Sequence, residues 1–144
     1  MWKEFVSNLT NDSKYLLPVK EDEIHKAEQI LNVKFSEELK SLLLETNGIK
    51  SEFQVDLIWS LDRILNDNIQ FRNYRDFKEL YMPFDCLLFF ADAGNGDQFA
   101  YTIIDGKIRR NDVFVWNHEN DSRIWVASSL KQYIEWWLNG TIKL

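Results

Sequence analysis

Hydrophobic residues recur every three or four positions in three segments of the first third of the chain, which is the spacing of an amphipathic helix. The pattern predicts helices over residues 2–10, 21–31 and 36–48. Ser36 is a favourable N-cap, and acidic residues fill the first turn of the second and third helices, where the helix dipole stabilises them. Asn32 is a typical residue for the end of the second helix.

The hydrophobic period changes to two in the middle of the chain. Alternation over residues 53–61, interrupted only at Ile58, predicts a half-buried strand. Residues 62–80 carry apolar positions among many charges, and we expect them to be mostly helical. Two apolar runs follow, at residues 84–91 and 98–104, and they predict a pair of neighbouring strands.

The last third of the chain predicts a hairpin and then a helix. Asp105-Gly106 favours the positive φ angles of a type I′ turn, so residues 107–116 are expected to return as the next strand. Residues 124–127 predict a further short strand. Ser128 is a candidate N-cap for the final helix. The buried side of that helix is expected to carry four apolar residues: Leu130, Ile134, Trp137 and Leu138.

This order of elements is typical of an α+β protein, in which helices and strands are segregated, rather than of alternating βαβ units. We expect a single domain over residues 1–144, with an antiparallel sheet packed against N-terminal helices and a C-terminal helix. No Pro/Gly/Ser-rich linker divides the sequence, and 144 residues suit one hydrophobic core.

Gly94 and Gly96 lie between the two apolar runs and are bracketed by Asp92 and Asp97. We expect one or both glycines to adopt positive φ, because the chain must reverse tightly between two strands. The simplest interpretation of the aspartates is that their side chains bond backbone amides of the turn. A calcium site is an alternative, but the regular oxygen spacing and closing glutamate of a calcium loop are missing. A phosphate cradle would lead into a helix rather than a strand.

The sequence is acidic, since 17 Lys and Arg residues oppose 23 Asp and Glu residues and give a formal net charge of -6. This balance argues against general binding to nucleic acid or an anionic membrane, and it favours a basic partner. The N-terminus lacks an apolar signal core and no apolar run is long enough to span a membrane, so we expect a cytoplasmic protein. Cys86 is the only cysteine, which excludes an internal disulfide, and its apolar surroundings predict a small core residue.

His118, Glu119 and Asp121 are candidates for a metal site or an acid/base cluster. A three-ligand zinc site is disfavoured because the chain has 2 His, and the other, His25, lies in a predicted helix. A hydrolase with His118 as general base is an alternative, whereas a solvated loop is the simplest interpretation. Trp116, beside this loop, favours a protein-binding surface because tryptophan is enriched among binding hot spots.

Trp136 and Trp137 cannot both face the core, since neighbouring residues of a helix are about 100° apart around its axis. Trp137 falls on the buried stripe of the last helix. Trp136 either covers the edge of the core or forms a contact patch for a partner.

Four segments occur in this order: a helical pair within residues 24–48, the Leu88–Phe99 segment with Gly94-Asn95-Gly96-Asp97, residues 113–119 and residues 126–130. Together they resemble the SUKH superfamily of bacterial immunity proteins, also named for the yeast Smi/Knr cell-wall regulator. One departure is Phe35-Ser36, where the family commonly has Leu-Pro, although a Ser N-cap does the same structural job. Among its members, the chain most resembles the YobK-type antitoxins of Bacillus, whose partner is an exported nuclease toxin.

The resemblance implies a small antiparallel-sheet fold and an immunity protein, or antitoxin, that neutralises a secreted nuclease toxin of a polymorphic toxin system. The partner would be a basic nuclease domain encoded by a neighbouring gene. A non-enzymatic regulatory module of the Smi/Knr type is the alternative, and in either case we expect no enzymatic activity, metal or cofactor.

A nuclease presents a basic groove to nucleic acid, so we expect a toxin-binding surface at an acidic rim of the sheet. Seven residues form this predicted surface: Asp92, Asn95, Asp97, Trp116, His118, Glu119 and Asp121. Gly94 and Gly96 are predicted to shape the turn that holds it.

Overall fold

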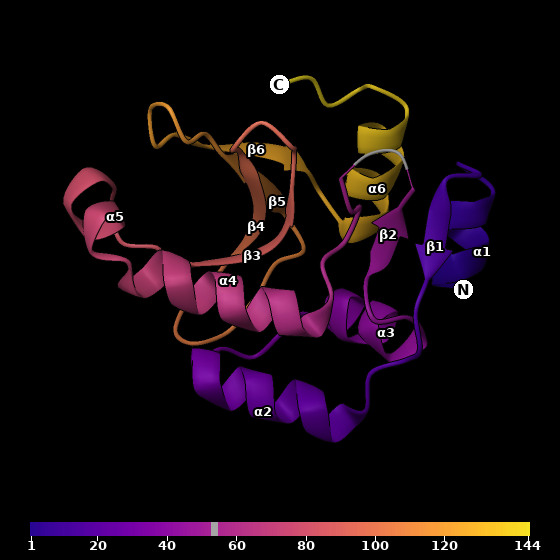
Figure 1. Cartoon of the computed structure of the whole chain (residues 1–144), viewed down its shortest axis with the longest axis horizontal. Helices are drawn as coiled ribbons and strands as arrows, with labels where there is room; N and C mark the ends of the chain where they lie inside the picture. Colours follow the sequence, from indigo (N-terminus) through magenta and orange to yellow (C-terminus); the bar gives the residue numbers. More distant parts are fainter. Residues whose placement is uncertain (53–54) are drawn as a thin grey trace.

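The computed structural model describes residues 1–52 and 55–144. It combines helices with antiparallel sheets, so the α+β fold predicted from the sequence is confirmed (Figure 1). In chain order the elements are α1 (Trp2–Ser7), β1 (Ser13–Tyr15), α2 (Glu21–Leu31), α3 (Glu37–Glu45), β2 (Ile49–Ser51), α4 (Leu61–Asn73), α5 (Arg75–Leu80), β3 (Leu87–Asp92), β4 (Gln98–Thr102), β5 (Val113–Trp116), β6 (Arg123–Ala127) and α6 (Leu130–Leu138).

Four strands form the main sheet in the order β3-β4-β5-β6, and every neighbouring pair is antiparallel. β1 and β2 form a separate two-stranded sheet. The helix α6 packs on the main sheet through Tyr133, whose ring centroid lies 5.4 Å from that of Phe90 and 4.8 Å from that of Phe99. All six residues of β3 are buried, as expected for a strand that is covered on both faces.

The strand β3 lies at an edge of the sheet, and α4 runs beside it (Figure 1). The buried amide of Asn68 in α4 accepts a hydrogen bond from the Phe89 N–H at 2.9 Å and donates one to the Phe89 carbonyl at 2.8 Å. The Arg72 Nη2 donates to the Leu87 carbonyl at 3.2 Å. Backbone groups that a fifth strand would bond are therefore satisfied by a helix, which prevents pairing with another chain.

Local signals in the sequence set several boundaries as predicted. The Ser36 side chain accepts a hydrogen bond from the Leu39 N–H at 3.2 Å and caps α3. Asn32 ends α2 in the left-handed conformation, with φ 54°. Asp105 and Gly106 both have positive φ, at 54° and 72°, which confirms the tight hairpin turn. α4 and α5 confirm that residues 62–80 are mostly helical.

The predicted strand over residues 53–61 is wrong where the structure describes it, and Phe53 and Gln54 lie outside the described residues. Leu57, Ile58 and Trp59 are all buried, so the segment does not alternate. Its backbone is irregular: the Trp59 N–H donates to the Phe90 carbonyl, and Ser60 already caps α4. The alternation of apolar and polar residues in the sequence therefore does not mark a strand with one buried and one exposed face, because consecutive side chains of this segment are buried.

The predicted strand over residues 107–116 is shorter than expected, because β5 begins only at Val113. The hairpin turn and the residues after it bond instead to Lys34, in the loop that follows α2: the Lys34 N–H donates to the Gly106 carbonyl, and the Ile108 N–H donates to the Lys34 carbonyl. At the start of α6, Ser129 rather than Ser128 is the N-cap, since its hydroxyl accepts the Gln132 N–H at 3.1 Å.

Two predictions about buried residues also need correction. Cys86 is exposed, because β3 begins at Leu87 and the preceding residues form a surface turn. On α6, Tyr133 is fully buried, whereas Trp137 and Leu138 are only partly buried against the core. Trp136 is also partly buried against the core, as expected for a residue at its edge. Its ring centroid lies 6.4 Å from that of Trp125.

Asn68→Ala is predicted to lower the free energy of unfolding by about 2–4 kcal/mol, because both backbone groups of Phe89 lose a buried partner. Asn73→Ala is the matched control. Both side-chain amides donate to the carbonyl four residues earlier, Asn68 to Ile64 and Asn73 to Ile69, but the Asn73 side chain is exposed. We expect a change within about 0.5 kcal/mol for the control. Urea unfolding of both variants measures the difference, and equal losses would contradict the role of Asn68 at the edge of β3.

Candidate functional site

Two turns meet at one end of the main sheet, and we call this region the turn end. It comprises the β3–β4 turn, residues 93–97, and the β5–β6 turn, residues 117–122. The buried carboxylate of Asp97 joins them, since its Oδ1 accepts the His118 N–H at 3.1 Å and lies 2.6 Å from His118 Nδ1. The structure thus brings together most of the residues that the sequence predicted for the site.

The β3–β4 turn has the backbone that its glycines predicted. Gly94 and Gly96 have φ angles of 86° and 104°. A Cβ at Gly96 would lie 2.8 Å from His118 Nδ1, so glycine is also needed for the close approach of the two turns. The Asp92 side chain accepts the Gly94 N–H at 3.0 Å, and the Asn95 side chain accepts the Asp97 N–H at 3.0 Å. Asp92 therefore bonds an amide of this turn, as the simplest interpretation held, whereas the Asp97 side chain bonds the amide of His118 in the other turn.

Asp92 is buried, and its carboxylate points into the protein rather than toward the surface. Its Oδ2 accepts hydrogen bonds from Trp59 Nε1 at 2.9 Å and from Arg63 Nη2 at 2.8 Å. The Arg63 guanidinium also stacks on the Trp59 ring, 4.2 Å from its centroid. Asp92 thus fixes the irregular segment before α4 to the end of β3 and is not available as a surface carboxylate.

Asp121 is the central group of the β5–β6 turn, where it adopts a left-handed φ of 60°. Its side chain accepts hydrogen bonds from Trp116 Nε1 at 2.7 Å, the Met82 N–H at 2.9 Å and Arg123 Nη2 at 3.2 Å. Burial alone would raise the pKa of this carboxyl group, but the three donors and the Arg123 charge outweigh it and lower the pKa. Asp121 therefore works as an anion that joins the loop at Met82 to the sheet.

The predicted place of Trp116 in the toxin-binding surface does not fit its position, because only 2% of its surface is exposed. Its ring lies edge-on to Phe84, Tyr81 and Phe71, with centroids 5.1, 5.0 and 5.6 Å away. Trp116 is part of the core beneath the turn end, since it is the last residue of the apolar strand β5 and its indole N–H has an internal acceptor in Asp121. The sequence pattern showed its neighbours in the chain but not the rings that cover it.

Three of the seven predicted residues remain accessible at the turn end. Asn95 and Glu119 are exposed, and the His118 side chain is 38% exposed. Met82 adds an apolar group beside them: it is 58% exposed, and its backbone is held by Asp121. Sequence analysis missed Met82 because nothing in the local pattern brings residue 82 to the β5–β6 turn.

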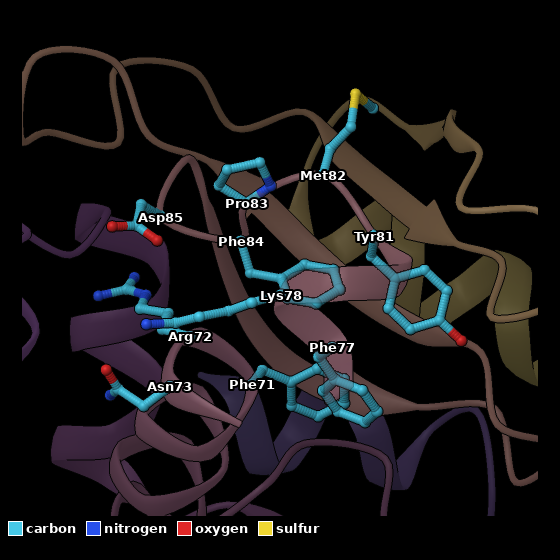
Figure 2. A pocket seen from close by; sticks show the side chains of 10 residues that line it. All are labelled: Phe71, Arg72, Asn73, Phe77, Lys78, Tyr81, Met82, Pro83, Phe84 and Asp85. Atoms are coloured by element: carbon cyan, nitrogen blue, oxygen red, sulfur yellow. The ribbon is translucent and has the colours of Figure 1, made fainter. Parts of the chain in front are cut away.

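A half-open pocket of about 460 Å³ adjoins the turn end, and its lining comes from α4, α5 and the loop that follows them (Figure 2). Tyr81, in this lining, donates its hydroxyl hydrogen bond to the His118 carbonyl at 2.9 Å. Within the described parts of the chain, no group of three or more His, Cys, Asp and Glu residues is placed to hold a metal ion. None of the helices there is long and apolar enough to cross a membrane.

The helices and antiparallel sheets form a single α+β domain, consistent with the SMI1-KNR4 fold. The SUKH_6 family model, described as SMI1-KNR4 cell-wall, matches residues 21–134, and the chain belongs to this family. SUKH domains are generally non-enzymatic and are associated with protein partners. No curated protein matches the chain.

Asp121→Asn is predicted to lower the free energy of unfolding by about 1–3 kcal/mol at pH 7, because it removes an anion that accepts three hydrogen bonds. The residue keeps its shape, and Asn tolerates the left-handed φ. Since the folded pKa is lowered, the wild-type advantage is present above the unfolded pKa, near 3.9, and is lost as the pH falls through the lower folded pKa.

Chemical unfolding of both proteins between pH 7 and pH 2 checks this. Glu119→Gln, an exposed neutralisation in the same turn, is the control and should change stability by less than about 0.5 kcal/mol throughout. A difference between wild type and Asp121→Asn that stays constant over this pH range would show that the charge of Asp121 contributes nothing.

Proposed function

We propose that this protein is an immunity protein that binds and neutralises a nuclease toxin encoded by a neighbouring gene. Membership of the SMI1-KNR4 family is the observation that carries the proposal, because the domain is consistent with an immunity-type protein. The similarity to the YobK-type antitoxins of Bacillus is part of the proposal, as is neutralisation of the toxin in the cytoplasm. The net charge of -6 supports a basic partner rather than direct contact with nucleic acid.

The turn end is the surface that we assign to the toxin. Glu119 and Asn95 present a carboxylate and an amide. The His118 side chain reaches from the β5–β6 turn to the Asp97 carboxylate of the other turn. The exposed side chain of Met82 supplies the apolar contact that the buried Trp116 does not. A flexible thioether suits this task, because Met adapts to irregular partner surfaces.

The buried members of the predicted surface have a supporting role in this proposal. Asp92, Asp97 and Asp121 hold the two turns and the Met82 loop in place before a partner arrives. A rigid surface loses little conformational entropy on binding, so these internal carboxylates favour affinity without touching the toxin.

The test pairs the protein with the toxin encoded beside it and measures association and dissociation at rising salt. Asn95→Lys combined with Glu119→Lys is expected to slow association about tenfold at low salt, because charges at an interface rim act mainly on the association rate. Met82→Ala is expected to speed dissociation about tenfold, as truncation of an apolar anchor does. Cell survival during co-expression with the toxin gives the biological readout.

Asp22→Lys is the control, since it reverses the charge of an exposed side chain in the first turn of α2, outside the turn end. This variant should retain toxin binding and protection. If the toxin binds but the turn-end variants behave like the control, the toxin docks elsewhere. If the folded protein neither binds the toxin nor protects cells, the immunity function itself is wrong and the regulatory module becomes the better hypothesis.

A further inference from the structure

The pocket beside α5 has two chemically different ends (Figure 2). Aromatic rings of Phe71, Phe77, Phe84 and Tyr81 gather at one end, while Arg72, Lys78, Asn73 and Asp85 lie toward the other. Its volume of about 460 Å³ is in the range of small-molecule sites, which combine an apolar lining with a few polar groups.

The aromatic end is rigid because its rings pack on one another and on the core. The ring of Phe77 lies 5.2 Å from that of Phe71 and 5.6 Å from that of Tyr81. Phe84 is buried, and its ring centroid lies 5.8 Å from that of Tyr81 and 5.1 Å from that of Trp116. Rings held in this way provide a preformed apolar surface, so a ligand need not order them.

The polar end carries an excess of positive charge in a protein that is acidic overall. Arg72 is held by two backbone carbonyls, those of Leu31 and Leu87, and its Nε is buried without a hydrogen-bond partner. No carboxylate of the described residues lies within 4.0 Å of Arg72 or of the exposed Lys78. Among the described residues that line the pocket, Asp85 is the only acid. Burial lowers the pKa of Arg72, and the charges of Asp85 and Cys86 only partly offset this effect.

We propose that this pocket binds a small ligand that joins an apolar ring to one anionic group, such as an aromatic carboxylate. The ring packs among Phe71, Phe77 and Phe84, and the carboxylate lies toward Lys78 and the Arg72 guanidinium. A neutral apolar ligand would form no ion pair with Lys78, and an anion without a ring would leave the aromatic surface in water. The proposal does not depend on the toxin, because the residues that carry it form the pocket by themselves.

The experiment compares N-acetylphenylalanine, which has a free carboxylate, with its neutral amide. Binding is followed by chemical-shift changes of backbone amides in the ¹⁵N-labelled protein. We expect saturable shifts at Asn73, Lys78 and Asp85, and about two- to fivefold tighter binding of the carboxylate than of the amide, the range for one partly exposed ion pair. Lys78→Gln should remove most of this preference while the amide binds as before.

Lys131→Gln is the matched control, because the Lys131 ammonium also lies near an aromatic ring, 5.4 Å from the centroid of Phe5, but outside the pocket. This variant should keep the preference for the carboxylate. Equal affinity for acid and amide in the wild-type protein, shifts centred away from the pocket, or the absence of saturable binding would each overturn the proposal.

A third ligand distinguishes the source of the anion. A longer peptide that ends in phenylalanine presents the same ring and carboxylate at a chain terminus. Tighter binding of this peptide than of N-acetylphenylalanine identifies a protein C-terminus as the source, whereas equal or weaker binding identifies a free small molecule. Both results keep the chemistry of a ring joined to one anionic group.

Discussion

The covered edge of β3 is the constraint on which the rest of the structure depends. A strand at the edge of a sheet, here apolar up to its last residue Asp92, would pair with another chain unless its backbone groups were satisfied. Asn68 does this from α4 by bonding both backbone groups of Phe89. Because the amide must sit at this strand, α4 is placed beside the sheet, and the irregular segment before it is drawn in so that the Trp59 N–H reaches the Phe90 carbonyl. The position of α4 then determines where α5 and the pocket lie.

Carboxylates stabilise the turn end of the same sheet. Asp92 bonds the segment before α4, Asp97 joins the two turns, and Asp121 binds the loop after α5. Each accepts at least two hydrogen bonds, which offsets the cost of removing a charge from water. The acidic motif that the sequence displays is therefore mostly internal, and the exposed chemistry belongs to the residues between these anchors, such as Asn95 and Glu119.

Signals that act within a few residues predicted the structure well, while those that depend on distant neighbours did not. Ser36, Asn32 and the Asp105-Gly106 turn behave as their local chemistry requires, since a cap or a positive φ needs only adjacent backbone. The burial of Trp116, the exposure of Cys86 and the irregular path of residues 55–60 depend on which elements pack against them. The pocket was not predicted for the same reason, because α4, α5 and the following loop enclose it only after α4 has docked on β3.

One short segment of backbone, residues 81–83, lines the pocket and is hydrogen-bonded to the turn end. Tyr81 lines the pocket and donates to the His118 carbonyl, while the next residue, Met82, donates its N–H to Asp121. Arg123 adds hydrogen bonds to the carbonyls of Met82 and Pro83 from the sheet side. The contacts that hold this wall of the pocket therefore also hold Met82 beside the turn end. Four hydrogen bonds thus fix residues 81–83 to the β5–β6 turn and to the first residue of β6, so this wall of the pocket is anchored in the same way as the residue that flanks the turn end.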